Sequence, residues 1–444
     1  MKLPNLLATR GGRLSAFFFL YLTEGLPLGF AATAIATQMR RQGVGPAEIG
    51  AFVGTLYLPW AFKWAMGPLV DVITSECFGR RRTWIVFTQA MMVMMMMVAL
   101  PIDFTAELKL YTFVILIFNF FGATQDVAID ALACNVLSEK ERGVANGLMF
   151  GGAYLGQALG GAGVLFLIPH IGLSGSYVFV AAVLLAVLLF IALPIKEPKD
   201  KARAVAHGPL LARVFGEIMQ FVREVFRAFS SSRAAWIGLI FALLPGGAYA
   251  LSLALQSNLA VELGLQDSDI AKLALASTVI SAVCCVIGGW LSDRFGRRKM
   301  LALFYVGTVI PGLALAWFMW RQGWIMPIDP QMPDRPLPAA ALVTMFWAAC
   351  LTFSVFQGLM YGTRSALFMD ITTPAVAATQ FTAYMALCNL VITYSATWQG
   401  FAIEHWGYPI TLTVDGVAGL LCLGLLPFMS LQTKAKPDGV GLQS

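Results

Sequence analysis

The sequence predicts an all-α integral membrane protein with twelve transmembrane helices in two six-helix pseudo-repeats. Hydrophobic residues make up 58% of the 444 residues and charged residues only 12%, which is too apolar for a soluble domain of this length. Twelve apolar stretches are long enough to cross the ~30 Å hydrocarbon core as helices. A short basic loop follows the second stretch of each half, which indicates that the two halves are copies of one duplicated unit.

Six of the apolar stretches precede a polar segment and six follow it. We therefore expect helix bundles at 1–195 and 234–444, joined by a cytoplasmic linker at 196–233. Apolar residues of the linker recur at helical spacing among charged ones, which predicts an amphipathic helix on the inner membrane surface. The twelve stretches are 14–36, 47–70, 83–101, 108–134, 143–169, 174–194, 234–260, 269–292, 300–320, 339–369, 375–401 and 408–431.

The distribution of basic residues predicts the orientation of the chain. One set of loops and termini holds 22 of the 30 Lys and Arg residues, and the opposite set holds 6. Cytoplasmic loops are enriched in Lys and Arg, so both termini are expected in the cytoplasm. The net charge of +6 follows from this bias and gives no support to nucleic-acid binding. The remaining two of the 30 Lys and Arg residues, Lys63 and Arg364, lie inside predicted helices.

The two basic loops share a pattern of glycine, aspartate, glycine and arginine. We expect the first glycine of each to let two helices approach closely, and the aspartate to pair with arginine or cap a neighbouring helix. The spacing resembles the signature between the second and third helices of each half in the major facilitator superfamily. The residues are Gly67, Asp71, Gly79, Arg80 and Arg81 in the first loop, and Gly289, Asp293, Gly296 and Arg297 in the second.

The two loops differ in length. Seven residues separate Asp71 from Gly79, whereas two separate Asp293 from Gly296. The first half therefore carries an insertion that should identify a subfamily.

Glycines also recur at four-residue spacing along the fifth stretch. Such ladders let helix backbones touch, which predicts tight packing within the first half. The two ladders are Gly143, Gly147 and Gly151, and Gly152, Gly156 and Gly160.

A charge inside the bilayer costs a few kcal/mol or more, so each one needs a partner, a cavity or a proton. Glu24 lies deep in the first stretch without a charged neighbour in sequence, which favours a cavity or proton-carrying role. Lys63 can form a fixed ion pair with Asp126 or Asp130, or act in the mechanism. Asp130 and Asp370 lie near cytoplasmic helix ends and are interpreted as structural charges.

Resemblance to the superfamily implies that the first, fourth, seventh and tenth helices line a central cavity. Glu24, Asp126 and Arg364 fall on three of these helices. The remaining candidates for substrate binding or proton coupling are Tyr249 and Gln256 on the seventh, and Gln357 and Tyr361 on the tenth.

A narrower resemblance joins the block Phe62-Lys63-Trp64, the lengthened first loop and Ala123-Thr124-Gln125-Asp126. These motifs resemble the acetyl-CoA transporter and AmpG-type muropeptide permease family. Lys63, Gln125 and Asp126 match its best-marked positions. The family implies proton-driven movement of large polar or anionic solutes. Muropeptide permeases commonly carry two additional helices, and this chain has room for twelve.

We therefore expect a multi-pass permease of the bacterial inner membrane that couples solute movement to protons by alternating access. A muropeptide-type peptidoglycan fragment is the leading substrate, and a siderophore or an acyl-CoA comes next. A non-transporting receptor or assembly factor on the same fold is the rival from another class. The expected partners are a small-molecule substrate, protons and the lipid bilayer, and the expected state is a monomer. No enzyme, metal or cofactor motif is found.

Overall fold

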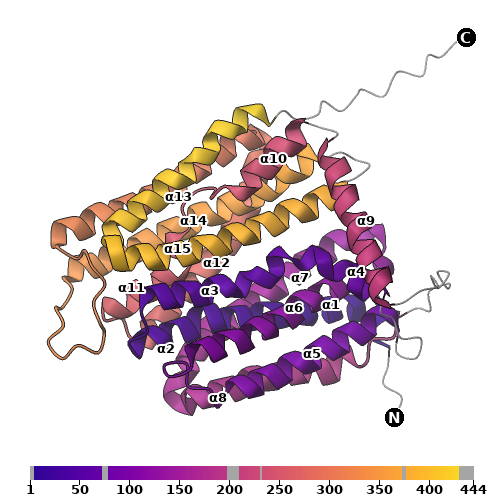
Figure 1. Cartoon of the computed structure of the whole chain (residues 1–444), viewed down its shortest axis with the longest axis horizontal. Helices are drawn as coiled ribbons and strands as arrows, with labels where there is room; N and C mark the ends of the chain where they lie inside the picture. The colour runs from indigo at the N-terminus through magenta and orange to yellow at the C-terminus, as the bar shows by residue number, and fades with distance from the viewer. Residues whose placement is uncertain (1–4, 73–78, 198–209, 231–232, 373–376, 430–444) are drawn as a thin grey trace, which may run out of the picture.

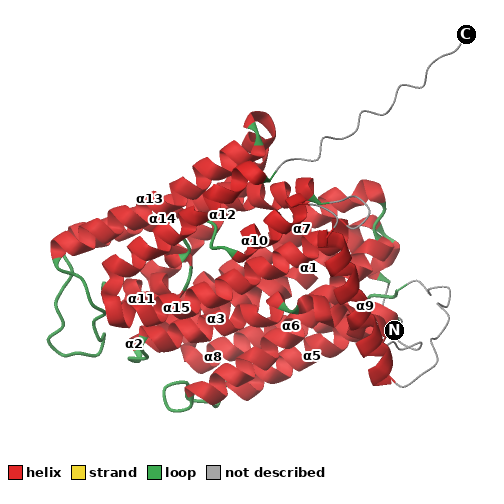
Figure 2. Cartoon of the chain, turned by 45° about the horizontal axis from the view of Figure 1, so that its top comes forward, coloured by secondary structure: helices red, strands yellow, loops and turns green. Residues whose placement is uncertain are grey.

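The computed structural model describes residues 5–72, 79–197, 210–230, 233–372 and 377–429, which form helices joined by loops (Figure 2). Figure 1 shows two groups of long helices side by side, one drawn in indigo to magenta and the other in orange to yellow. We call them the N-terminal group and the C-terminal group. Eight stretches of the described chain are long and apolar enough to cross a membrane, so this is a multi-pass integral membrane protein.

The N-terminal group extends from residue 6 to residue 192, and π-helical segments continue three of its helices. Its elements are η1 (Leu6–Ala8), α1 (Arg10–Gly29), η2 (Phe30–Ile35), α2 (Ala36–Arg41), α3 (Pro46–Ala61), η3 (Lys63–Ala65), α4 (Met66–Val72), α5 (Arg80–Ala99), α6 (Leu108–Val136), α7 (Glu139–Ala158), η4 (Leu159–Gly163), α8 (Val164–Val187) and η5 (Leu188–Ala192).

The C-terminal group extends from residue 233 to residue 428. Its elements are α10 (Arg233–Leu243), η6 (Ala250–Ser252), α11 (Ala254–Glu262), α12 (Asp267–Phe295), α13 (Arg297–Gln322), α14 (Ala340–Ile371), α15 (Ala377–Leu420) and η8 (Leu421–Phe428).

Helix α9 (Leu210–Ser230) crosses one end of both groups (Figure 1). It contacts α4 in the N-terminal group, and α10 and α15 in the C-terminal group. A helix therefore forms inside the predicted linker, and it bridges the groups as well as presenting an apolar face. We call this end of the bundle the linker end and the opposite end the far end.

Two of the apolar stretches are 49 residues long, and each contains a glycine outside the helical region of backbone conformation. The φ angle is 71° at Gly172 and 78° at Gly407. A residue with a Cβ rarely adopts such angles, so these glycines let the chain reverse at the far end. They lie between the predicted stretches 143–169 and 174–194, and 375–401 and 408–431.

The seventh predicted stretch, 234–260, is not one continuous helix. Helix α10 ends at Leu243, and helical structure resumes at Ala250. Pro245 lacks a backbone N–H, and Gly247 has a φ of 77°, which together interrupt the helix. The Gly247 N–H donates to the Gly419 carbonyl at 3.0 Å, and the Ala248 N–H donates to Thr308 Oγ1 at 3.1 Å.

One of the two predicted glycine ladders packs as expected. A Cβ at Gly152, Gly156 or Gly160 would lie 1.9–2.3 Å from a carbonyl oxygen of α1, so only glycine allows this approach of two backbones. Gly147 and Gly151, which belong to the other ladder, have open space beside them, so neither makes such a contact.

Close packing at the far end also joins the two groups. Helices α3 and α15 share extensive contacts. A Cβ on Gly50 would lie 3.0 Å from Gly400 Cα and 2.5 Å from the Ala396 carbonyl oxygen. Because both positions lack a side chain, the two backbones touch here and leave little space between the groups at this end.

Candidate functional site

Four ionisable side chains gather deep in the N-terminal group, and we call them the Lys63 cluster: Glu24, Lys63, Asp126 and Asp130. Lys63 Nζ lies 2.7 Å from Asp126 Oδ2, and the Asp126 side chain is only 4% exposed. Glu24 on α1 is an electrostatic neighbour of the other three. The predicted neighbourhood of Lys63 and Asp126 is therefore formed, and it includes Glu24.

Local structure explains how these side chains meet. Helix α3 ends after Ala61, and the 3₁₀ turn η3 begins at Lys63, which turns the ammonium group towards α6. Asp126 and Asp130 lie one turn apart on α6 and so share a face. The Tyr21 hydroxyl of α1 donates to Asp130 Oδ1 at 2.5 Å.

The cluster holds three carboxyl groups for one ammonium group. Glu24 Oε1 is buried and has no hydrogen-bond partner among the described residues. Like charges this close repel strongly in a medium of low dielectric constant, so a proton or a second cation bound here would reduce the repulsion. The cluster is thus chemically able to exchange protons.

A cavity of about 450 Å³ opens beside the cluster at the linker end. Lys63, Gly67 and Asp130 line it from the N-terminal group. Helix α9 contributes Glu217 and Glu224, so the linker helix forms part of the cavity wall. A polar solute that entered from this end would meet the cluster directly.

Gln125 lies on another side of α6. Its Nε2 donates to Gln89 Oε1 and, at 3.3 Å, to the Ile85 carbonyl. Gln89 Nε2 in turn donates to the Leu184 carbonyl at 2.9 Å. Gln125 is therefore fully buried between α5, α6 and α8, and the structure does not bring it into the Lys63 cluster.

Arg364 is the deep cation of the C-terminal group. It is 4% exposed, and its Nη1 donates to the Tyr249 hydroxyl at 3.0 Å. Its guanidinium carbon lies 5.1 Å from the ring centroid of Tyr361, which is on the same helix. Gln357, nearly two turns earlier on α14, is half-buried.

The break in the seventh stretch positions Tyr249. The Tyr249 and Ala250 N–H groups donate to Asp415 Oδ2 at 2.8 Å and 3.0 Å. Gln399 Nε2 donates to the other oxygen of Asp415 at 2.7 Å. Asp415 thus holds the interrupted backbone in place, a role that sequence reasoning missed although the charge lies inside the predicted stretch 408–431.

Gln256 lines a second, smaller cavity between the two helix groups. The cavity measures about 60 Å³ and is also lined by Thr33, Tyr57 and Gln157 of the N-terminal group. Both groups therefore contribute polar side chains to the space between them.

The second basic loop forms the ion pairs that its pattern predicts. Arg297 lies 3.0 Å from Asp293 and 2.8 Å from Asp370, which ties the start of α13 to the ends of α12 and α14. Gly296, with a φ of 95°, ends α12. Among the described residues, a Cβ at Gly67 or Gly289 would meet no atom within 4 Å, so the prediction that these two glycines allow close helix approach is wrong.

Close approach occurs next to the predicted position. A Cβ at Gly288 would lie 2.2 Å from the Leu359 carbonyl oxygen. The helix face that packs is thus one residue away from the expected one, which rotates it by about 100° around the helix.

In the first basic loop, Gly79 has a φ of 94° and precedes α5. The Arg81 N–H donates to Glu197 Oε2 at 2.8 Å, and its side chain donates to the Val70 carbonyl at 3.2 Å. Arg80 is the first residue of α5. The predicted Asp71 side chain lies outside the described residues.

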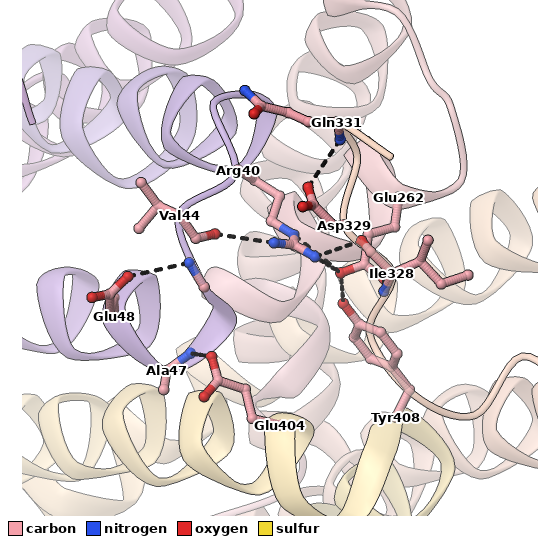
Figure 3. Close-up of polar contacts among 11 residues, drawn as sticks. Arg40, Val44, Ala47, Glu48, Glu262, Ile328, Asp329, Gln331, Glu404 and Tyr408 are labelled. Carbon is pink, nitrogen blue, oxygen red and sulfur yellow. Dashed lines mark hydrogen bonds and ion pairs between the residues drawn. The ribbon is translucent and has the colours of Figure 1, made fainter. Parts of the chain in front are cut away.

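The far end carries a buried polar network between the two groups (Figure 3). Arg40 Nη2 lies 2.7 Å from Glu262 Oε1, with the two side chains 4% and 0% exposed. Tyr408 donates to the same oxygen at 2.6 Å, and the Ile328 N–H donates to the other oxygen at 3.0 Å. The network closes the far end with fully satisfied charges.

Arg40 is one of the six basic residues in the loops opposite the Lys- and Arg-rich set, and sequence reasoning did not consider Glu262 as its partner. The available signal was weak, since Glu262 follows the predicted stretch 234–260 by only two residues. Nearby, Glu404 accepts from the Ala47 N–H at 2.9 Å (Figure 3). This bond fastens the start of α3 to α15.

A model of the Major Facilitator Superfamily matches residues 14–396. The chain belongs to the Major Facilitator Superfamily. The family and its solved members named below are transporters rather than enzymes. Membership confirms the predicted all-helical membrane fold and gives the cavity of a transporter as the natural context for the Lys63 cluster.

Within this superfamily, the chain is similar to the anhydromuropeptide permease of Escherichia coli. The two are 25% identical over 405 residues, which cover 89% of this chain and 75% of that permease. The similarity confirms the resemblance to muropeptide permeases that the motifs around Lys63 and Asp126 predict.

Solved superfamily structures share the fold at low sequence identity. A D-xylose–proton symporter has a TM-score of 0.70 and 13% identity, and the match covers 95% of this chain and 98% of the symporter. The nucleoside transporter NupG has a TM-score of 0.64 and 11% identity, covering 94% and 98%. These likenesses describe the architecture alone.

Proposed function

We propose that this protein is a proton-coupled permease that carries a large polar or anionic solute by alternating access. Twelve transmembrane helices in two bundles, 1–195 and 234–444, would rock against each other around a central site. The segment 196–233 would join them on the cytoplasmic side. The excess of Lys and Arg in the linker-end loops and termini supports a cytoplasmic linker end in the bacterial inner membrane.

The observation that carries the proposal is the Lys63 cluster beside the open cavity. One ammonium group and three carboxyl groups share a site that reaches a cavity of about 450 Å³ at one end. The buried Arg40–Glu262 pair closes the other end. Protonation of a carboxyl group there would reduce the negative charge that an anionic solute meets, which couples movement of one to movement of the other.

A muropeptide-type peptidoglycan fragment is the substrate to test first. The anhydromuropeptide permease of Escherichia coli, with which this chain shares 25% identity over most of its length, supports that choice. The polar lining of the cavity, with Lys63, Gln220 and Thr382 among its residues, suits a solute rich in hydroxyl, amide and carboxyl groups.

The experiment is uptake of a labelled anhydromuropeptide into proteoliposomes with an imposed pH gradient. We expect accumulation that a protonophore abolishes. Glu24→Gln should remove gradient-driven accumulation and leave counterflow exchange, because the variant keeps the shape of the site but cannot release a proton. Glu107→Gln, at an exposed residue of the far end, is the matched control and should behave as wild type.

Two outcomes would contradict the proposal. Specific binding without flux would favour a receptor on the same fold. Unchanged pH dependence in Glu24→Gln would remove Glu24 from the coupling step.

A further inference from the structure

Arg364 differs from the other deep cations because no acidic side chain among the described residues forms an ion pair with it. Among the described residues, Arg40 pairs with Glu262 and Lys63 pairs with Asp126. In the described part of the chain, the Arg364 guanidinium contacts the Tyr249 hydroxyl and the face of the Tyr361 ring. Its Nε is buried and has no hydrogen-bond partner in the described chain.

Two acids of the C-terminal group, Asp370 and Asp415, are engaged with other partners. Asp370 pairs with Arg297 at 2.8 Å. Asp415 accepts from Gln399 and from two backbone N–H groups. Groups that act electrostatically on Arg364 include Tyr249, Tyr305, Tyr361 and Cys388, all of which are neutral in their ordinary protonation states.

A buried guanidinium without a counter-charge is expensive, since the desolvation of one ion costs several kcal/mol. It also has unused donors: a guanidinium carries five N–H groups in one plane. This planar fork matches a carboxylate or a phosphate through two parallel hydrogen bonds. An anion that reached Arg364 would therefore be bound both by electrostatic attraction and by two parallel hydrogen bonds.

The site lies next to the space between the two helix groups. Tyr361, which covers the guanidinium, is 38% exposed. Both Arg364 and Lys63 act electrostatically on Tyr361. Tyr57 and Tyr154, from the N-terminal group, are neighbours of the same ring. Tyr361 is thus the exposed side chain through which a solute between the groups would approach Arg364.

We propose that Arg364 and the Tyr249 hydroxyl form an anion subsite that binds a carboxylate or phosphate group of the transported solute. The subsite belongs to the C-terminal group and is separate from the Lys63 cluster, which handles protons. This inference rests on the proposed permease function for its solute, and it restricts that solute to an anion.

The test measures binding to the purified full chain in nanodiscs by calorimetry, with two matched pairs of probes. Muramyl dipeptide and its methyl ester form the carboxylate pair; 4′-phosphopantetheine and pantetheine form the phosphate pair. We expect wild-type protein to bind the anionic member of one pair roughly 10- to 100-fold more tightly. The pair that shows this preference identifies the anionic group.

Arg364→Gln should abolish the preference, and Arg364→Lys should retain part of it. Tyr249→Phe should lower it a few-fold, which keeps the test available if Arg364→Gln does not fold. Arg321→Gln is the control, because Arg321 is an exposed residue that lies over Trp317. It should bind as wild type.

Equal binding of both members in each pair, or an anion preference that survives in Arg364→Gln, would overturn the subsite. Anion binding that depends on Arg364 without any uptake would contradict the permease and leave the subsite standing. Uptake of the muramyl dipeptide methyl ester as fast as the free acid would contradict the anion subsite and leave the permease standing.

Discussion

Lys63 and Arg364 are deep cations in the two helix groups, and their surroundings differ in charge. Lys63 lies 2.7 Å from Asp126 and among two further carboxyl groups, Glu24 and Asp130. Arg364 contacts a tyrosine hydroxyl and a tyrosine ring. The N-terminal site thus has more carboxyl groups than cations, and the C-terminal site has a guanidinium with no acidic partner among the described residues.

This difference shows that the two groups repeat a helix architecture without repeating its charges. The paired aspartates lie on α6, and the arginine lies on α14, the corresponding helix of the second group. A site with excess carboxyl groups and a separate unpaired cation can hold a proton and an anion at the same time. Substitutions that unbalance one site at a time test this contrast.

The largest effect should come from Lys63→Met. It leaves Asp126 buried without a counter-charge, so we expect the free energy of unfolding to fall by about 3–5 kcal/mol. Thermal unfolding of the full chain in detergent micelles would measure this. The double variant Lys63→Met with Asp126→Leu should regain most of the loss.

The double variant also separates structure from mechanism. Restored stability with restored uptake would make Lys63 and Asp126 a structural pair. Restored stability without uptake would place them in transport. A single variant as stable as wild type would contradict the view that Lys63 compensates the cluster.

Arg40→Gln should have an intermediate effect. Glu262 loses its guanidinium partner but keeps the Tyr408 hydroxyl and the Ile328 N–H. We expect a loss of about 1–3 kcal/mol, measured by the same unfolding assay. Arg41→Gln serves for comparison, because Arg41 is 28% exposed and should lose less. A loss in Arg40→Gln larger than that in Lys63→Met would reverse the ranking.

Arg364→Met should leave the free energy of unfolding unchanged or raise it by about 1 kcal/mol, because it removes a buried charge that has no counter-charge and leaves no buried carboxylate behind. Thermal unfolding without any anion in the buffer is the measurement. A loss comparable to that of Lys63→Met would show that the arginine is compensated after all, and would end the contrast between the two sites.

The smallest effect concerns an ion pair outside the membrane-spanning segments. Arg13 lies 2.6 Å from Glu141, and its hydrogen bond holds the pKa of Glu141 below the usual range. This stabilisation is therefore present at neutral pH and is lost as the pH falls through that lowered pKa. Glu141→Gln should lower the thermal midpoint slightly at pH 7 and match wild type in strong acid. An undiminished difference in strong acid would contradict this pairing.

Much of the architecture was predictable because its signals are local. Apolar length predicts membrane-spanning helices, and the glycines at 152, 156 and 160 predict a helix contact that the structure contains. The break after Leu243 was missed, although Pro245 and Gly247 carried the signal. The apolar composition of 234–260 predicted one continuous helix, whereas Pro245 and Gly247 favour an interruption.

The candidate site was predicted only in part. A buried charge stands out in an apolar stretch, so Glu24, Lys63, Asp126 and Arg364 could be named from residue type and depth. The partners of these residues could not be predicted in the same way. Gln125 follows the same motif as Asp126, yet it packs against Gln89, because adjacent residues of a helix face different directions.

The membrane fold, the superfamily and the short set of deep charges could be predicted from the amino-acid sequence, since each depends on composition or on residues near one another in the chain. Which charges are neutralised depends instead on tertiary packing. Arg40 meets Glu262 across 222 residues, and Arg364 meets no acid among the described residues. Such pairings depend on how helices distant in sequence pack, and at these distances the position of a side chain on its helix decides between a salt bridge and an open binding site.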